Sequence, residues 1–194
     1  SAQFRKYSND FLNIGVGAQA LGMSSAMVAS ANDVTSGYWN PAGLLSVTDN
    51  LQIGAMHSEY FAGIAKYDYI GIAKPLTDKN KALSFSLIRF GVDDIANTLF
   101  LYNADGSIDY DNISTFSAAD YAFIGSYAST SPIENLNYGV SAKIVHRTVG
   151  SFAHSWGIGA DAGAQYKMGN WKFGFLAKDI TTTFNAWSFT FTDD

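Results

Sequence analysis

Residues 155–167 read SWGIGADAGAQYK, and they alternate strictly between two kinds of residue. Every second position from Trp156 to Tyr166 is apolar, with an aromatic ring at each end, and the positions between them are polar or glycine. A period of two is typical of a β-strand with two unlike faces. At about 3.3 Å per residue and a tilt near 45°, the stretch spans roughly 23 Å, close to the ~25 Å apolar band of an outer-membrane barrel.

Weaker versions of this alternation recur after residue 50 and predict about seven strands in all. The other predicted strands lie within 51–60, 64–75, 82–87, 121–128, 138–147 and 171–178. Polar stretches predict short turns at 77–80, 131–137 and 168–170, and a long loop rich in Asp, Asn and Ser at 93–119. If the long loop lies outside the cell, all three turns are periplasmic, as in outer-membrane barrels.

The composition favours the same class of protein. Charged residues make up 15% of the 194 residues, below the roughly 25% of soluble domains, and aromatic residues also reach 15%. No apolar run approaches the ~20 residues of a membrane helix. The net charge of −5 argues against a nucleic-acid partner, and the absence of cysteine excludes disulfides and thiolate metal sites. We therefore predict an all-β fold, a transmembrane antiparallel up-and-down β-barrel that contacts lipid in the outer membrane of a Gram-negative bacterium.

The first 49 residues differ from the remainder, so we divide the chain into an N-terminal plug or hatch (1–49) and a barrel portion (50–194). An Ala-, Ser- and Met-rich run at 18–31 predicts one short helix, and a proline turn follows it. Gly15, Gly17 and Gly22 superficially match a dinucleotide-binding loop, but no strand precedes them and their spacing is wrong. Tight packing inside a lumen explains these glycines better.

Strand parity also bears on the end of the chain. Seven strands that start at the periplasm end outside, so the tail 181–194 is expected in an external loop or at the start of another strand. Because bacterial barrels have an even number of strands and an open edge cannot face lipid, we favour a chain that continues beyond Asp194. The alternative is that a strand at 184–192 closes a small barrel.

Three segments, 11–23 (FLNIGVGAQALGM), 31–34 (ANDV) and 38–44 (YWNPAGL), resemble the N-terminal signature of the PorV/PorQ family. These are Bacteroidota outer-membrane proteins related to the FadL long-chain fatty-acid transporters. The resemblance implies a barrel of about 14 strands when complete, about 7 of them in this chain, with a short N-terminal helical plug. It also implies that Asn40, Pro41 and Ala42 form the hatch motif in the lumen.

The same resemblance implies a function in protein export. Its best-known members act in type IX secretion, so we expect an envelope export or assembly component whose partners are other outer-membrane or secretion-complex proteins. The alternative is an outer-membrane transporter of hydrophobic small molecules such as fatty acids. Transport would need an apolar pocket near the hatch, built from residues such as Met23, Met27, Val28, Trp39 and Leu45. A soluble β-sandwich would spread its aromatic residues throughout and is disfavoured.

No catalytic constellation is found, so we predict no enzymatic activity, no cofactor and no metal. His57, His146 and His154 lack metal-ligand spacing, and His146 fits a girdle or rim position. Oxygen-bearing residues alternate in the loop 103–111, but the terminal glutamate of a calcium loop is missing, so a solvated acidic loop is expected.

Side-chain parity assigns two further groups of residues. The predicted aromatic girdle consists of Tyr121, Tyr138, Trp156, Tyr166 and Trp171. A lumen-facing polar set is expected to form a salt-bridged interior or, alternatively, a solute-selective pore lining; it consists of Lys143, Arg147, Asp161, Gln165, Lys167, Lys172 and Lys178. Ile124 interrupts the small and polar face of its strand.

Overall fold

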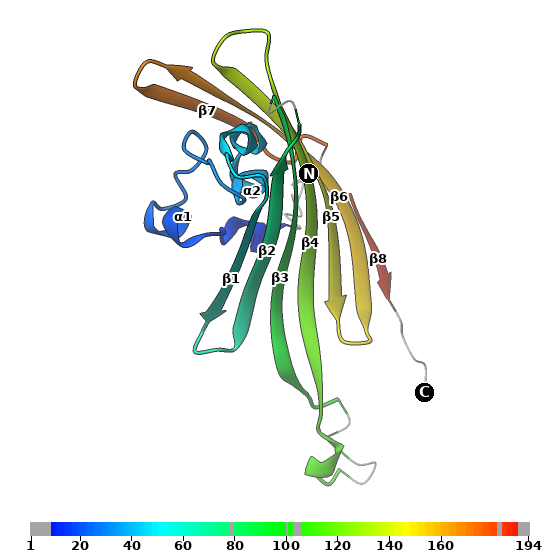
Figure 1. The fold of residues 1–194 in the computed structure, drawn as a ribbon. Helices are drawn as coiled ribbons and strands as arrows, with labels where there is room; N and C mark the ends of the chain where they lie inside the picture. The colour runs from blue at the N-terminus through cyan, green and yellow to red at the C-terminus, as the bar shows by residue number, and fades with distance from the viewer. Residues whose placement is uncertain (1–8, 78–79, 100, 103–105, 182–183, 190–194) are drawn as a thin grey trace, which may run out of the picture.

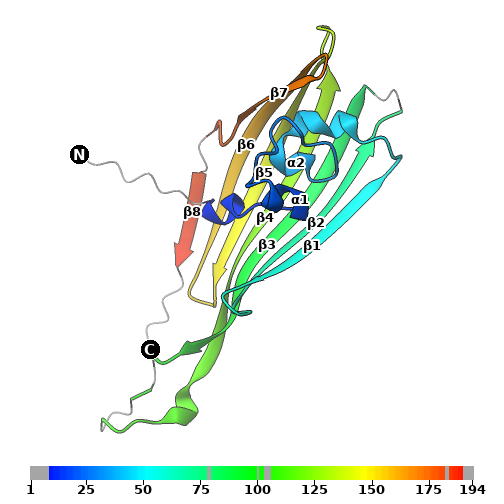
Figure 2. The ribbon, with the colours of Figure 1, turned by 90° about the vertical axis from the view of Figure 1, so that its left-hand side faces the viewer.

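The computed structural model describes residues 9–77, 80–99, 101–102, 106–181 and 184–189. Within them, one antiparallel sheet is curled into a half-barrel, and the N-terminal segment (residues 9–51) lies against its concave face (Figures 1 and 2). The strands are β1 (Gln52–Tyr60), β2 (Ala65–Pro75), β3 (Lys81–Asn97), β4 (Ser114–Thr130), β5 (Leu136–Val149), β6 (Ala153–Met168), β7 (Trp171–Ala177) and β8 (Phe184–Phe189).

Strands β1 to β7 follow one another across the sheet in chain order. The β2–β3, β4–β5 and β6–β7 turns therefore share one end, here the turn end, and the long β3–β4 connection lies at the opposite, loop end (Figure 1). This separation of turns and loop is as predicted. The loop itself is shorter than predicted, because β3 continues to Asn97 and β4 begins at Ser114.

Strands β7 and β8 both pair with β6, so they occupy one position in the sheet. Strand β7 pairs with the second half of β6, β8 pairs with Ala153–Ile158, and between them the Ile180 amide donates to the Ala160 carbonyl at 2.9 Å. The predicted possibility that the tail starts another strand is confirmed by β8, within the predicted range 184–192, whereas an external loop is wrong for residues 184–189. Because β8 pairs with β6, it adds no eighth position to the sheet and does not close a small barrel. Residues 190–194 lie outside the described residues. Alternation could not reveal this continuation, because the backbone leaves the ladder after Ala177.

The N-terminal segment contains four short helices instead of the single one predicted. Its elements are η1 (Asp10–Asn13), α1 (Ala18–Gly22), α2 (Ser36–Trp39) and η2 (Pro41–Ser46). The helix predicted within 18–31 ends early, since Ser24 and Ser25 adopt positive φ angles of 51° and 65°. In the described part of the chain, no helix has the length and apolar character needed to cross a membrane.

The two faces of the sheet differ in which side chains they expose. On the convex face Ile158 is 63% exposed and Trp171 is 70% exposed. On the concave face Lys143 is 4% exposed and Ser155 is fully buried. Large apolar side chains are normally the buried ones. The prediction that the apolar face of 155–167 points outward is confirmed.

The core lies between the N-terminal segment and the concave face. Its main cluster joins Phe11, Met27 and Trp39 of the segment to Tyr67 and Ile124 of the strands. Ile124, which interrupted the small and polar pattern of its strand, is buried in this cluster. The exception in the alternation therefore marks a place where the wall makes apolar contact with the segment.

Candidate functional site

Asn40, the first residue of the predicted hatch motif, is completely buried where the N-terminal segment meets the wall. Its Nδ2 lies within hydrogen-bond distance of three carbonyl oxygens, those of Val28 (2.8 Å), Ala164 (3.1 Å) and Phe175 (3.3 Å). Its Oδ1 accepts the Ala42 amide at 3.2 Å, which caps η2. One side chain thus ties the segment to itself and to both β6 and β7.

Three glycines on the concave face of β5–β7 form a recess for the hatch motif. A Cβ atom at Gly139 would lie 2.6 Å from the backbone nitrogen of Ala42, and one at Gly163 would overlap the Asn40 side chain. A Cβ at Gly174 would lie 2.5 Å from the backbone carbonyl group of Val28 in the segment. Sequence reasoning missed this recess, although glycines at concave-face positions of three neighbouring strands were a usable signal.

Small hydroxyl side chains receive the segment next to this recess. The Oγ atoms of Ser126 and Ser141 both donate to the carbonyl of Gly37 at 3.2 Å and lie 2.8 Å from each other. A Cβ at Gly37 would lie 2.5 Å from the Oγ of Ser84. Helix α2 therefore approaches the wall closely, and side-chain hydroxyls satisfy its backbone.

Replacing Asn40 by alanine is expected to lower the free energy of unfolding by about 2 kcal/mol, because buried carbonyl and amide groups lose their partner. Urea unfolding of the purified protein in detergent measures this loss, and hydrogen exchange should rise in residues 28–46. The control is Asn170→Ala in the exposed β6–β7 turn, with an expected change below about 0.5 kcal/mol. Equal losses in the two variants would contradict the assigned contacts.

Tyr38 and Trp39 of α2 bind the first part of the N-terminal segment. The Tyr38 hydroxyl donates to the Leu12 carbonyl, and Trp39 Nε1 donates to the Val16 carbonyl at 2.9 Å. Burial raises the pKa of Tyr38, so its hydroxyl remains a neutral donor. Lys178 Nζ lies 5.0 Å from the centre of the Tyr38 ring and 5.8 Å from that of Trp39, within cation–π range.

An ion cluster, in which Lys143 and Asp161 are buried and Asp179 is partly exposed, lies beside the interruption between β7 and β8. Lys143 Nζ lies 2.8 Å from a carboxylate oxygen of Asp161 and 2.8 Å from one of Asp179. The Asp179 amide donates to Asp161 Oδ1 at 2.7 Å, and Asn9 Nδ2 donates to Asp179 Oδ1 at 3.3 Å. The cluster joins β5, β6, the interruption and the start of the segment.

The remaining predicted lumen-facing residues divide into two groups. Arg147 forms a bidentate pair with Asp120 at 2.9 and 2.7 Å, and Gln165 donates to two carbonyls of the segment. Lys167 and Lys172 instead face each other across β6 and β7 at the turn end, where both are exposed. Of the predicted polar set, Lys143, Arg147 and Asp161 therefore form ion pairs on the concave face, whereas Lys167 and Lys172 are exposed at the turn end.

All five residues of the predicted girdle lie on the convex face. Tyr121 is half-buried and the other four are exposed. Toward the loop end, the His146 ring stacks on Trp156 at 4.0 Å and faces Tyr121 at 6.4 Å between ring centres. The other three girdle residues lie toward the turn end: Tyr138, Tyr166 and Trp171.

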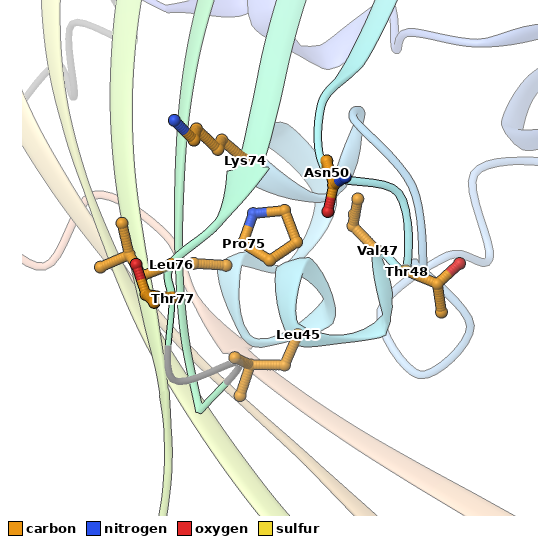
Figure 3. A pocket seen from close by; sticks show the side chains of 9 residues that line it. Leu45, Val47, Thr48, Asn50, Lys74, Pro75, Leu76 and Thr77 are labelled. Atoms are coloured by element: carbon orange, nitrogen blue, oxygen red, sulfur yellow. The ribbon is translucent and has the colours of Figure 1, made fainter.

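A pocket of about 520 Å³ opens at the turn end, where the segment runs into β1 (Figure 3). Of the five residues predicted to form an apolar pocket near the hatch, only Leu45 lines it. Met27 and Trp39 are buried in the core, and Met23 is exposed. Lys74 lies at the edge of the pocket, and the other lining residues include Val47, Thr48, Asn50, Pro75 and Leu76.

The acidic loop offers no assembled metal site within the described residues, where no three Asp, Glu, His or Cys side chains are grouped for a metal. Asp109 Oδ1 accepts the Asp111 amide at 3.0 Å and so caps η3 (Tyr110–Asn112). Residues 103–105 of the predicted loop lie outside the described residues.

A scan against protein-family models and a search of curated proteins found no match to the chain. The resemblance of residues 11–44 to the PorV/PorQ signature therefore stays a prediction from the sequence.

Proposed function

We propose that the chain forms part of a plugged outer-membrane β-barrel of the PorV/PorQ type, which acts in an envelope protein-export complex related to type IX secretion. The observation that carries the membrane assignment is the exposed apolar convex face. One row of paired residues across β1–β6 is apolar throughout: Ala55, Ile70, Leu87, Phe123, Ile144 and Ile158. In water such a face would be a large exposed apolar patch, whereas lipid would cover it.

The strand directions support a larger barrel. Strands β1 and β7 run the same way, because each strand reverses the direction of the previous one. Rotation of a second copy about the barrel axis would therefore place β7 parallel to β1. An antiparallel barrel needs an odd number of further strands between these two edges, which agrees with a total of about 14.

The fixed N-terminal segment supports a role at the barrel surfaces instead of an open pore. Asn40, the glycine recess and the Lys143 cluster hold the segment against the wall on both sides. A barrel whose lumen is filled by such a fixed segment suits a component that binds other proteins of the export complex.

Deletion of the gene in its native bacterium is expected to lower secreted cargo at least about tenfold, with complementation by the intact gene and by Asn170→Ala. Cargo is quantified in the medium and on the cell surface, and dye uptake controls for damage to the outer membrane. Normal secretion, together with purification of the protein without any outer-membrane partner, would contradict the export function.

A second function, transport of hydrophobic small molecules, is favoured by the concave face beyond the segment. There, toward the loop end, another row of paired residues is entirely apolar: Tyr60, Ala65, Val92, Ala118, Val149 and Ala153. An apolar mouth suits a hydrophobic ligand. Under this alternative the deletion strain takes up labelled fatty acid more slowly while its protein secretion is unchanged.

A further inference from the structure

An ionic network lies on the convex face of β1–β3 near the loop end. His57, Asp68 and Arg89 are neighbours in one row, with His57 Nδ1 2.6 Å and Arg89 Nη1 3.6 Å from Asp68 oxygens. Asp93 bonds Arg89 at 3.1 Å and Lys66 at 3.4 Å. The same row continues across β4–β6 with the stacked rings of Tyr121, His146 and Trp156. The convex face is thus charged on one side of the half-barrel only.

Arg89 is directed away from the apolar rows. A Cβ atom at Gly91 would lie 2.8 Å from its guanidinium, so the side chain folds over Gly91 toward Asp93 and the loop end. Long cationic side chains at an apolar boundary extend toward the polar side in this way. This direction alone would fit a simple boundary between lipid and water.

The tip of the β1–β2 hairpin does not fit such a boundary. Phe61 and Ile64 lie beyond the ionic network and are 77% and 62% exposed. Phe61 and Ala62 adopt φ angles of 55° and 56°, a strained conformation for residues other than glycine that hairpins usually assign to Asn or Gly. From the tip toward the turn end the order is apolar, charged, apolar, whereas one leaflet of a bilayer has a single change from apolar to polar.

A groove of about 490 Å³ lies beside the ionic network. Ile70 and Leu87 contribute apolar walls, and Arg89 and Tyr121 line its polar side. Arg and Tyr are enriched among the residues that dominate the energy of protein interfaces. The groove and the exposed tip can be covered together only by a surface that itself alternates between apolar and polar groups, which a protein provides and lipid does not.

We propose that this corner of the convex face, from Phe61 to Ile70 with the groove, binds a second protein within the same membrane. The inference rests on the proposed barrel with its convex face toward lipid. Glu59 also belongs to the network, since one of its carboxylate oxygens lies 3.6 Å from His57 Nε2. With Glu59, the network has three carboxylates against two permanent cations, and Arg89 is its least exposed member. The partner therefore presents an apolar side chain to the groove and a basic side chain to Glu59 and Asp68.

The test is photo-crosslinking in living cells from a photoreactive amino acid at Ile70, with Ile144 as the matched position. Both side chains lie on the convex face with similar exposure, 53% and 47%. We expect one protein adduct from position 70 and lipid adducts only from position 144. Glu59→Lys with Asp68→Lys should lower the protein adduct at least about tenfold, whereas Glu134→Lys with Asp111→Lys at other exposed sites should not.

The outcomes separate the two proposals. Lipid adducts alone at position 70, an adduct with a second copy of the chain, or a protein adduct that survives the charge reversal would each overturn the docking site. Retained lipid labelling at position 144 shows that the charge-reversed protein is still folded in the membrane. Absence of lipid labelling at position 144 in the parent protein would instead overturn the barrel itself.

Discussion

Replacing Lys143 by methionine is expected to lower the free energy of unfolding by about 3–5 kcal/mol, because it leaves the buried Asp161 carboxylate without its cation. Lys143 is 4% exposed and contacts both Asp161 and Asp179 at 2.8 Å. Methionine retains most of the side-chain volume, so the loss reports charge and not packing. Urea unfolding of the purified protein in detergent, followed by tryptophan fluorescence, measures it.

Two variants make this result specific. Lys167→Met removes a lysine from an exposed position of the neighbouring strand and should change the free energy of unfolding by less than about 0.5 kcal/mol. Lys143→Met combined with Asp161→Asn removes one of the uncompensated charges and should recover part of the loss. A double variant less stable than Lys143→Met alone would show that charge pairing is not the cause.

Replacing Gly139 by valine is expected to displace the hatch motif from the wall and to destabilise the protein by about 3 kcal/mol. The first added carbon atom would already lie 2.6 Å from the backbone of both Pro41 and Ala42. Backbone cannot move aside as the end of a flexible side chain can. Limited proteolysis should cut the segment 9–51 in the variant and spare it in the parent protein.

Gly125 supplies the matched control for this substitution. It lies in the neighbouring strand β4, on the convex face, and a Cβ atom there would meet nothing within 4 Å. Gly125→Val should therefore be neutral or slightly stabilising, since valine favours strands over glycine. Similar proteolysis of the two variants would show that the recess does not hold the segment.

The strands and their faces were predictable because alternation is a local property. Side chains of a strand point to opposite faces whatever the strand pairs with. The assignment of Trp156 and Ile158 to one face and Asp161 to the other therefore survives in the structure. The end of β7 was not predictable in the same way, because the alternation stops where Lys178 and Asp179 leave the ladder. Lys178 lies over the Tyr38 ring, and Asp179 pairs with Lys143.

The sequence by itself determined that one face of the sheet is apolar and that the other is mostly small or polar. Only the tertiary structure decided what Asn40 binds, since its partners Ala164 and Phe175 lie 124 and 135 residues away. The same holds for the contacts of Gly139, Gly163 and Gly174: alternation places these glycines on the concave face, but it does not tell what lies against them. Their role comes from the close approach of a distant backbone, and curvature of the sheet, not local periodicity, brings that backbone to them.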